Sequence, residues 1–211
     1  MSRPASLARA LDQHCADLLG CRRCAHGPGV QPIVARARRP GAMLIGQAPG
    51  QTEAGGGRPF AGRAGATLFR WLERAGMDEA TAREWLYIAA VTRCYPGPHP
   101  SGRGDRVPSV SERERCGDWL DAELRIIRPK VIVLVGRLAM DRFLGAHPLD
   151  ELVGREHPVT HAGGRSIAIP LPHPSGASSW IHAPEHRRLL EDALDRLGAR
   201  FRSSRTRRGA A

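Results

Sequence analysis

The chain has 211 residues, of which 41% are hydrophobic, and its formal net charge is +11 at pH 7. This length suits one compact domain with a full hydrophobic core. No apolar run reaches membrane-spanning length and the start lacks a secretory pattern, so we expect a cytoplasmic protein rather than a membrane protein. The positive charge favours a polyphosphate partner such as nucleic acid. A basic tail on an ordinary enzyme is the alternative, because five arginines crowd the last twelve residues.

Hydrophobic periodicity predicts helices and strands in alternation along most of the chain. Helices are expected near residues 4–19, 63–75, 78–84, 111–127, 138–144 and 183–197, and strands at 42–45, 86–91, 131–135 and 166–171. Ser111 and Glu114 are expected to form a capping box at the start of the fourth helix. The glycine- and proline-rich segments 51–62 and 95–110 are expected to be loops. Residues 1–198 are predicted to form a single domain, and residues 199–211 a basic, disordered tail.

The alternation indicates an α/β fold of three layers, in which helices cover both faces of a central four-stranded parallel sheet. In such sheets the ligand site lies beyond the carboxyl ends of the strands. Three of the four predicted strands run at that end into unusual sequence, at residues 46–50, 92–94 and 173–175. The positions of these segments therefore predict one shared site.

Four of the five cysteines form a set of candidate metal ligands. Cys21 and Cys24 have the spacing with which two thiolates chelate one centre, Cys94 follows the second strand, and Cys116 lies early in the next helix. Disulfides are rare in the cytosol, so clustered cysteines favour metal binding or catalysis. By itself the Cys-x-x-Cys pair is also compatible with zinc or with a redox role. Cys15 stands outside the set and is expected to be a small buried residue.

Two glycine-rich motifs follow the first strand. The first is Gly-Gln-Ala-Pro-Gly at residues 46–50, and the second is Gly-Arg-Pro-Phe-Ala-Gly-Arg-Ala-Gly at residues 57–65. Together they resemble the uracil-DNA glycosylase superfamily, especially its thermophile-type branch that carries an iron–sulfur cluster. From the residues alone, the first motif is also compatible with a plain strand-to-loop turn.

The resemblance implies a role for several residues of these motifs. Uracil would be bound by Gly46, Gln47 and Ala48, and Gln47 would also help to place the attacking water. Phe60 would stack on the base, although its residue type alone leaves a core aromatic as the alternative. His173 would donate to uracil O2 as the glycosidic bond breaks, because a neutral imidazole N–H stabilises the departing anion. A structural histidine in a proline-rich turn is the alternative for His173.

The segment after this histidine is expected to contact DNA. Residues 176–182 should enter the minor groove, and Ser175 and Arg63 are expected to bind the strand. Trp180 is either an apolar wedge that fills the space left by a flipped base or a residue that packs the last helix against the core.

The resemblance also implies a [4Fe–4S] cluster. Its ligands would be Cys21, Cys24, Cys94 and Cys116, which occupy places that match the cluster ligands of the thermophile-type branch. The cluster is expected to join the amino-terminal helix and the exposed loop to the sheet, without a redox role in catalysis.

Two positions depart from the family pattern. The asparagine that reads the pyrimidine edge in many members aligns with Ala90, and alanine cannot make the paired donor and acceptor contact that separates uracil from cytosine. Gln47 stands where glutamate is usual, which removes a possible carboxylate base. Glu53 is the nearest acidic substitute, although a solvated loop carboxylate is an equal interpretation of this residue.

The chain is therefore expected to be a monofunctional uracil-DNA glycosylase that acts as a monomer on uracil-containing DNA and leaves an abasic site in base excision repair. Lys130 is the only lysine and precedes the third strand, away from the predicted site, so no lysine amine is expected to form a Schiff base there. One alternative is a uracil-DNA crosslinking member, for which the loop holds His99 but lacks the expected basic pattern. The other is a non-catalytic iron–sulfur module that binds DNA.

Overall fold

The computed structural model describes residues 3–24, 29–35, 40–102, 104–175 and 180–209. Strands β1 (Ala42–Gly46), β2 (Leu86–Ala90), β3 (Val131–Val135) and β5 (Gly164–Leu171) form the parallel part of one sheet, and β4 (His157–His161) pairs with β5 in the antiparallel direction. The strand order is β2-β1-β3-β5-β4. The predicted α/β fold and its four parallel strands are confirmed, with one further strand at the edge.

The additional strand, β4, carries a weak sequence signal. Of its five residues only Val159 is buried. Pro158 cannot donate a backbone hydrogen bond, which confines it to a sheet edge. An edge strand needs no continuous hydrophobic pattern, and this is why the sequence did not indicate a strand here.

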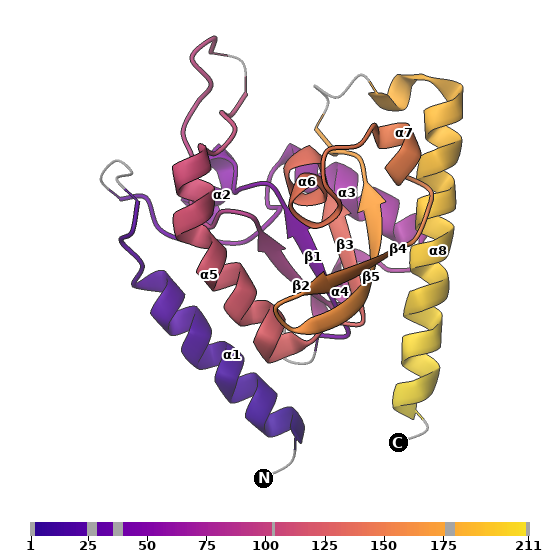
Figure 1. Ribbon diagram of the computed structural model, residues 1–211, viewed down its shortest axis with the longest axis horizontal. Helices are drawn as coiled ribbons and strands as arrows, with labels where there is room; N and C mark the ends of the chain where they lie inside the picture. The colour runs from indigo at the N-terminus through magenta and orange to yellow at the C-terminus, as the bar shows by residue number, and fades with distance from the viewer. Residues whose placement is uncertain (1–2, 25–28, 36–39, 103, 176–179, 210–211) are drawn as a thin grey trace.

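Helices cover both sides of the sheet (Figure 1). On one side α1 (Arg3–Leu19) packs along α5 (Val110–Ile127), and on the other side α8 (Pro184–Gly209) contacts α3 (Arg63–Arg74). The helix α4 (Glu79–Trp85) leads directly into β2, and α6 (Arg137–Leu144) packs on β1 and β3. Among the described helices, none is both long enough and apolar enough to cross a membrane.

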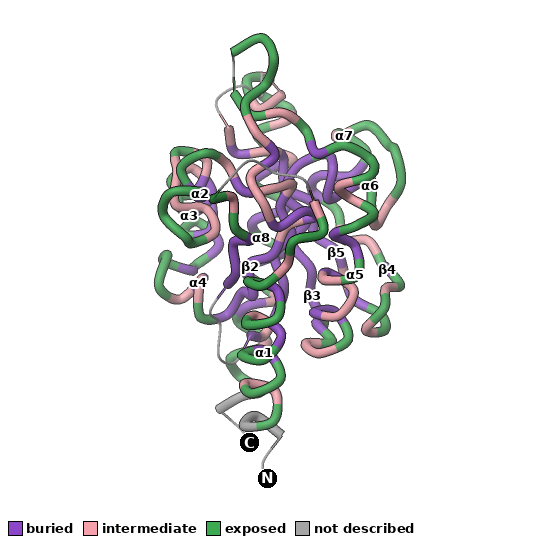
Figure 2. The backbone as a smooth tube through the Cα atoms, turned by 90° about the vertical axis from the view of Figure 1, so that its left-hand side faces the viewer, coloured by how far each residue is buried: buried purple, intermediate pink, exposed green. Residues whose placement is uncertain are grey.

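The core lies between these helices and the strands. Figure 2 shows buried residues gathered along the strands, and exposed residues on the outer sides of the helices and in the loops. All five residues of β1 and all five of β3 are buried. Continuous burial of this kind is what a parallel strand covered on both faces requires, and it places the two central strands beneath the site.

A short helix replaces part of the loop that we expected at residues 51–62. The helix is α2 (Gln51–Gly56), and its fold depends on Glu53, which is only 8% exposed. One carboxylate oxygen of Glu53 accepts a hydrogen bond from the Gly50 N–H at 2.9 Å, and the other accepts from the Gly62 N–H at 3.0 Å. A glycine-rich sequence can form a helix here because the buried carboxylate accepts hydrogen bonds from backbone N–H groups on both sides of the helix in sequence.

The predicted capping box of α5 is shifted by two residues. Ser109 is the N-cap: its hydroxyl accepts from the Glu112 N–H, and the Glu112 carboxylate accepts from the Ser109 N–H at 2.7 Å. Ser111 and Glu114 have the same spacing, but the prediction that they form the capping box is wrong. Arg106 decides between the two pairs, because its guanidinium also binds Glu112.

The last helix is longer than expected, and the prediction of disorder from residue 199 is wrong for the described residues. α8 continues to Gly209. Phe201 is buried, with its ring edge-to-face against Trp85 at 5.2 Å between centroids. Arg200 donates to Glu156 at 2.9 Å. These contacts hold the end of the chain as a helix in spite of its high charge. The short helix α7 (Leu149–Leu152) is a second element that the sequence did not predict.

Candidate active site

One cavity of about 710 Å³ opens at the carboxyl ends of the parallel strands. The structure brings the three segments predicted to meet there to the same place: the turn after β1, the segment after β2 and the segment after β5. The cavity is lined by all five residues of the Gly46–Gly50 turn and by Phe60, Arg63, Ala90, Arg93, Asp105, Arg106, His173 and Ser175. A space of this size accommodates a nucleobase together with part of its sugar.

Phe60 is held against the start of the Gly-Gln-Ala-Pro-Gly turn. A Cβ atom placed on Gly46 would lie 3.1 Å from the Phe60 ring, so any larger residue would require the ring to move away by a few tenths of an ångström. Phe60 has a positive φ of 53°, a strained conformation for an aromatic residue. Arg83 on α4 stabilises it by donating to the carbonyls of Pro59 and Phe60 at 3.0 and 3.3 Å. The ring is partly buried and faces the cavity, as stacking on a base requires.

The backbone of Phe60 also rests on α3. A Cβ atom on Gly65 would lie 1.9 Å from the Phe60 carbonyl oxygen. Gly65 therefore allows the loop and the first turn of α3 to touch. This contact explains physically why a glycine stands at the end of the second motif.

His173 lies across the cavity mouth in the segment after β5. Its Nδ1 atom accepts a hydrogen bond from the Ser175 N–H at 3.3 Å and lies 2.9 Å from the Ser175 hydroxyl. Because the backbone N–H can only donate, Nδ1 is the acceptor and the neutral ring carries its proton on Nε2. Burial lowers the pKa of His173, which keeps the imidazole neutral at neutral pH. The ring packs against Gly136, where a Cβ atom would lie 2.9 Å from the ring.

The Gly-Gln-Ala-Pro-Gly turn presents its backbone under the cavity. The Gly46 and Gln47 carbonyls accept hydrogen bonds from the N–H groups of Val91 and Thr92, at 2.9 and 3.2 Å. These bonds fasten the turn to the end of β2. Ala90 lines the cavity at the end of β2, and its methyl side chain offers no polar contact to a base.

Glu53 lines the cavity, but its carboxylate is hydrogen-bonded to the backbone of its own loop. Both carboxylate oxygens accept backbone hydrogen bonds, from Gly50 and from Gly62. The side chain is buried, so the interpretation as a solvated loop carboxylate is wrong. Glu53 therefore shapes the loop, and its oxygens are already engaged before any water arrives.

A second, more open groove continues from the cavity mouth along α3. Its volume is about 1120 Å³, and it shares Arg63, Asp105 and Ser175 with the inner cavity. Trp180 belongs to the short 3-10 helix η1 (Trp180–His182) and stacks on His186, with ring centroids 4.2 Å apart and the planes inclined by 3°. Residues 176–179, part of the segment predicted to enter the minor groove, lie outside the described residues.

The four predicted ligand cysteines line a separate cavity of about 250 Å³. Cys21, Cys24, Cys94 and Cys116 all face it, whereas Cys15 lies elsewhere, against Ala35 and the Tyr87 hydroxyl. The indole N–H of Trp119 donates to the Cys21 sulfur at 3.3 Å. Burial, reinforced by the other three cysteines, raises the pKa of Cys94 to about 12.

The lining of this cavity is compatible with a four-iron cluster, because four cysteine thiolates are the usual ligand set of such a cluster. Among the described residues, no three or more His, Cys, Asp or Glu side chains are positioned as a single metal-ion site. Arg22, Arg23 and Arg115 line the same cavity and would balance the negative charge of four thiolates. The residues present therefore fit a cluster.

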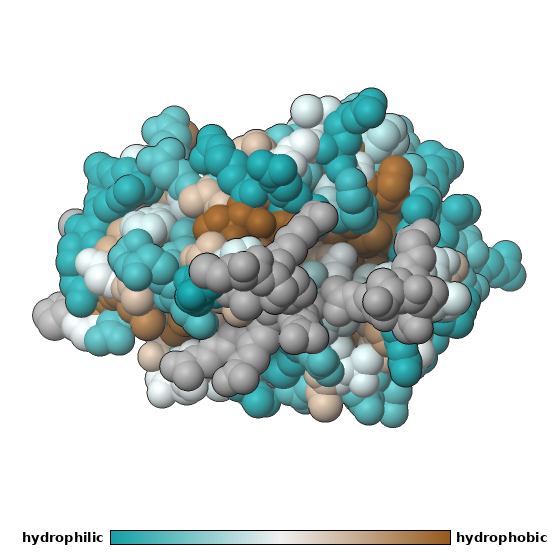
Figure 3. All heavy atoms as spheres, turned by 90° about the horizontal axis from the view of Figure 1, so that it is seen from below, coloured by the Kyte–Doolittle hydropathy of each residue, from teal (hydrophilic) through white to brown (hydrophobic). Residues whose placement is uncertain are grey.

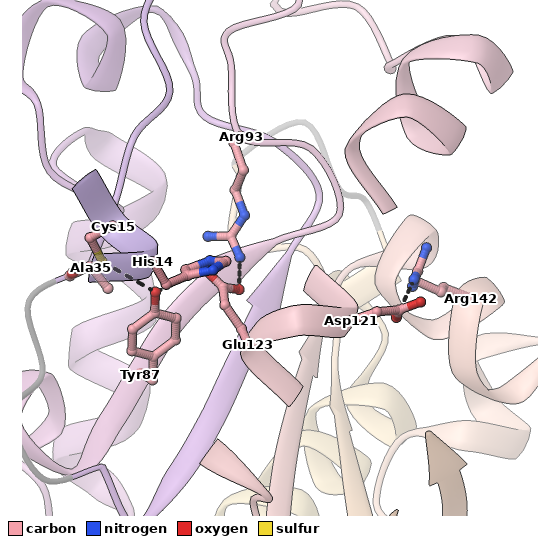
Figure 4. A network of polar contacts seen from close by, with 8 residues as sticks. All are labelled: His14, Cys15, Ala35, Tyr87, Arg93, Asp121, Glu123 and Arg142. Carbon is pink, nitrogen blue, oxygen red and sulfur yellow. Dashed lines mark hydrogen bonds and ion pairs between the residues drawn. The ribbon is translucent and has the colours of Figure 1, made fainter. Parts of the chain in front are cut away.

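A buried polar network connects the two cavities (Figure 4). Arg93 lines both of them and is fully enclosed, and its guanidinium binds the carboxylate of Glu123 on α5. Glu123 also accepts from the Tyr87 hydroxyl at 2.8 Å and lies 3.2 Å from His14. Burial, together with the charge of Glu123, raises the pKa of Tyr87, so its hydroxyl remains a donor. Sequence reasoning missed this network, although the position of Arg93 next to Cys94 was a usable signal.

The comparisons with known proteins agree with this geometry. The family model of the uracil DNA glycosylase superfamily matches residues 35–197. The chain is similar to the Type-4 uracil-DNA glycosylase of Archaeoglobus fulgidus, with 30% identity over 90% of this chain and 92% of that protein. It is 35% identical to the Type-4 uracil-DNA glycosylase of Thermotoga maritima, in a match that covers 63% of this chain and 64% of the Thermotoga protein. The chain therefore belongs to the uracil DNA glycosylase superfamily.

Proposed function

We propose that this chain is a monofunctional uracil-DNA glycosylase, which hydrolyses the bond between uracil and deoxyribose and leaves an abasic site for base excision repair. The observation that carries the proposal is the joint lining of one cavity by the ring of Phe60, the neutral imidazole of His173 and the backbone of the Gly46–Gly50 turn. The similar proteins named as Type-4 uracil-DNA glycosylases support it.

In the proposed reaction the target nucleotide leaves the duplex and its base enters the cavity. Phe60 stacks on the base, while Gly46, Gln47 and Ala48 hold its edge. The bond between uracil N1 and the sugar breaks with its electron pair on uracil, and the Nε2 proton of His173 stabilises the charge at O2. This donation needs a neutral ring with the proton on Nε2, and the Ser175 N–H selects that tautomer.

The DNA strand itself would lie along the outer groove, where Arg63 and Ser175 are exposed to it. Trp180 remains a candidate wedge, although its stacking on His186 would have to break before it could enter the duplex. Action as a monomer and a cytoplasmic location remain predictions. Sedimentation of the purified protein and fractionation of the source cells would test them.

The product is expected to be an unbroken abasic strand. Lys130 is exposed and directly precedes β3, so it lies at the amino end of the sheet, opposite the cavity. Its amine cannot reach a sugar bound there to form a Schiff base. The loop histidine of the crosslinking alternative, His99, is exposed, bonds to Ser101 and is not among the described residues that line the cavity.

The deciding experiment is a single-turnover assay with uracil-containing DNA, in single- and double-stranded form. We expect release of free uracil and an abasic strand that breaks only after heating in alkali. The absence of any released base, with the protein folded, would contradict the proposed function. Direct strand cleavage, or a protein–DNA adduct stable to denaturation, would contradict the monofunctional assignment.

We further propose that Cys21, Cys24, Cys94 and Cys116 hold a [4Fe–4S] cluster. When bound, the cluster would act as a structural crosslink between the segment after α1, the segment after β2 and the start of α5. Iron analysis and the visible spectrum of protein purified without oxygen test this. We expect about four irons per chain, and loss of colour in Cys94→Ser but not in Cys15→Ser. Colourless protein that contains zinc in place of iron would show that the assignment is wrong.

A further inference from the structure

Two steps of the proposed reaction have no residue assigned to them so far. As uracil departs, the sugar gains positive charge, and the attacking water must lose a proton. A carboxylate near the sugar serves both needs, but Gln47 carries an amide, and Glu53 is buried and bonded to the backbone of its own loop. A carboxylate that is not fixed in this way is therefore the better candidate.

Asp105 is the other carboxylate that lines this cavity among the described residues. A Cβ atom placed on Gly50 would lie 3.0 Å from Asp105 Oδ2, so the carboxylate sits directly over the Gly-Gln-Ala-Pro-Gly turn. Asp105 belongs to the outer groove as well as to the inner cavity. It thus stands at their junction. With the base in the cavity and the DNA strand in the groove, the sugar that links the base to the strand would lie at this junction.

The loop holds Asp105 in place through contacts on both sides. Asp105 pairs with Pro98 in an antiparallel bridge, the Arg106 N–H donates to the Gly97 carbonyl at 3.0 Å, and the His99 N–H donates to Gly104 at 2.9 Å. The guanidinium of Arg106 fastens the loop to α5, donating to Glu112 at 2.7 Å. A carboxylate on a loop anchored in this way needs little reorganisation before it acts.

We propose that Asp105 is a catalytic residue that takes the place of the missing glutamate at position 47. This inference rests on the proposed glycosylase function. The carboxylate stabilises the positive charge of the sugar as the bond to uracil N1 breaks. The water oxygen then bonds to the sugar C1′, one water proton passes to Asp105 and on to solvent, and the uracil anion takes up a proton from solvent. No other reactant is required.

Asp105 shares its part of the cavity with groups from several elements. Tyr95 is on the same loop, and burial, followed by its hydrogen bond with Asp105, raises the pKa of the Tyr95 hydroxyl. Glu53 from α2 lies beside the same face of Gly50, where an added Cβ atom would be 2.8 Å from Glu53 Oε2. Arg63 comes from the start of α3, and Ser175 follows β5. The proton acceptor and the anion-stabilising His173 therefore stand on different elements around one cavity.

The test is Asp105→Asn, measured in single-turnover uracil release and in uracil-DNA affinity. We expect the rate at neutral pH to fall by about 10²-fold, the lower end of the range for a lost general base. DNA affinity should stay the same or rise, because a negative charge near the phosphates is removed. Asp105→Glu should recover part of the rate.

The matched control is Glu114→Gln, which makes the same charge change on the exposed side of α5, outside the cavity. Its rate should equal that of the wild type. If Asp105→Asn retains its fold and releases uracil within threefold of the wild-type rate, Asp105 has no catalytic role. A wild-type protein that releases no uracil would instead overturn the proposed function, so the two failures are distinct.

Discussion

At the scale of single residues, the cavity depends on a few atoms whose positions are set by the backbone. The Ser175 N–H selects the tautomer of His173, and burial lowers the pKa of its ring. Gly46 and Gly65 leave room for the ring and the carbonyl of Phe60. These are short-range steric and hydrogen-bonding effects, and each can be altered by one substitution.

His173→Ala should lower the single-turnover rate of uracil release by about 10²-fold, because one donor to the departing anion is lost. The measurement is the rate at enzyme excess and neutral pH. His147→Ala removes an exposed imidazole that does not line the cavity and should leave the rate unchanged. A decrease smaller than threefold in His173→Ala would remove this residue from the mechanism.

Gly65→Ala should displace Phe60, because the new methyl group would lie 1.9 Å from its carbonyl oxygen. We expect a loss of about 1–3 kcal/mol in the free energy of unfolding, the usual cost of overpacking. Uracil release should fall by about tenfold or more, since a small misplacement of a binding group is costly. Gly55→Ala is the control, because nothing lies within 4 Å of its added methyl group. Equal behaviour of the two variants would refute this account of Gly65.

At the scale of elements, the segments between the strands are held by buried or partly buried carboxylates. Glu53 closes the loop around α2, Glu112 caps α5 and anchors the loop that carries Asp105, and Glu123 joins α5 to β2. In each case a charged side chain satisfies groups that would otherwise lack partners, which keeps the irregular backbone around the cavity in one conformation.

The pair of Arg106 and Glu112 should make stability depend on pH. The guanidinium holds the pKa of Glu112 at about 2, well below its ordinary value. Because the folded-state pKa is depressed, the contribution is complete above the unfolded-state pKa of about 4.5 and is lost as the pH falls towards 2. Arg106→Ala should therefore cost about 1 kcal/mol of unfolding free energy at pH 7, allowing for solvent screening, and almost nothing near pH 2.

Denaturant titrations at several pH values measure this difference. Arg58→Ala breaks an ion pair with Glu79 in which both side chains are largely exposed, at 61% and 45%, and should cost less than Arg106→Ala at pH 7. A cost for Arg106→Ala that does not change with pH would show that packing, and not the ion pair, anchors the loop.

At the scale of the whole molecule, the arginine-rich end of the last helix is separate from the arginines of the cavity. Arg63 and Arg106 lie at the cavity, whereas the arginine-rich end of α8 lies with both termini at the opposite end of the sheet (Figure 1). Seen from that end, the surface is mostly hydrophilic around a smaller hydrophobic region (Figure 3). The end of α8 is therefore a structural extension, anchored by Phe201, and it is remote from the proposed site.

A chain that ends at residue 198 should be less stable than the full chain. It lacks Phe201, whose buried ring packs on Trp85, and Arg200, which pairs with Glu156. We expect a loss of about 3 kcal/mol or more in the free energy of unfolding, the scale of a deleted core phenylalanine. A chain that ends at residue 206 keeps both contacts and should match the full chain. Equal stability of the two truncated chains would support a domain boundary at 198.

The sequence by itself determined what depends on local pattern. Hydrophobic periodicity located the four parallel strands and most helices, and the motifs at 46–50 and 57–65 with the four cysteines indicated the superfamily. Such features are visible because neighbouring residues carry the signal. Ser109 and Ser111 show where this reasoning ends: both begin a sequence that fits a capping box, and only the contact of Glu112 with Arg106 selects the first.

Tertiary structure alone decided which polar groups are engaged and which remain available. It placed Glu53 on backbone N–H groups and Asp105 over Gly50, although both are acidic residues in glycine-containing loops. Arg93 is buried between the two cavities because its guanidinium binds Glu123, thirty residues away in the sequence. The last helix continues past residue 199 because Phe201 packs on Trp85. These outcomes depend on contacts between residues distant in the chain, whose free energies no local pattern contains.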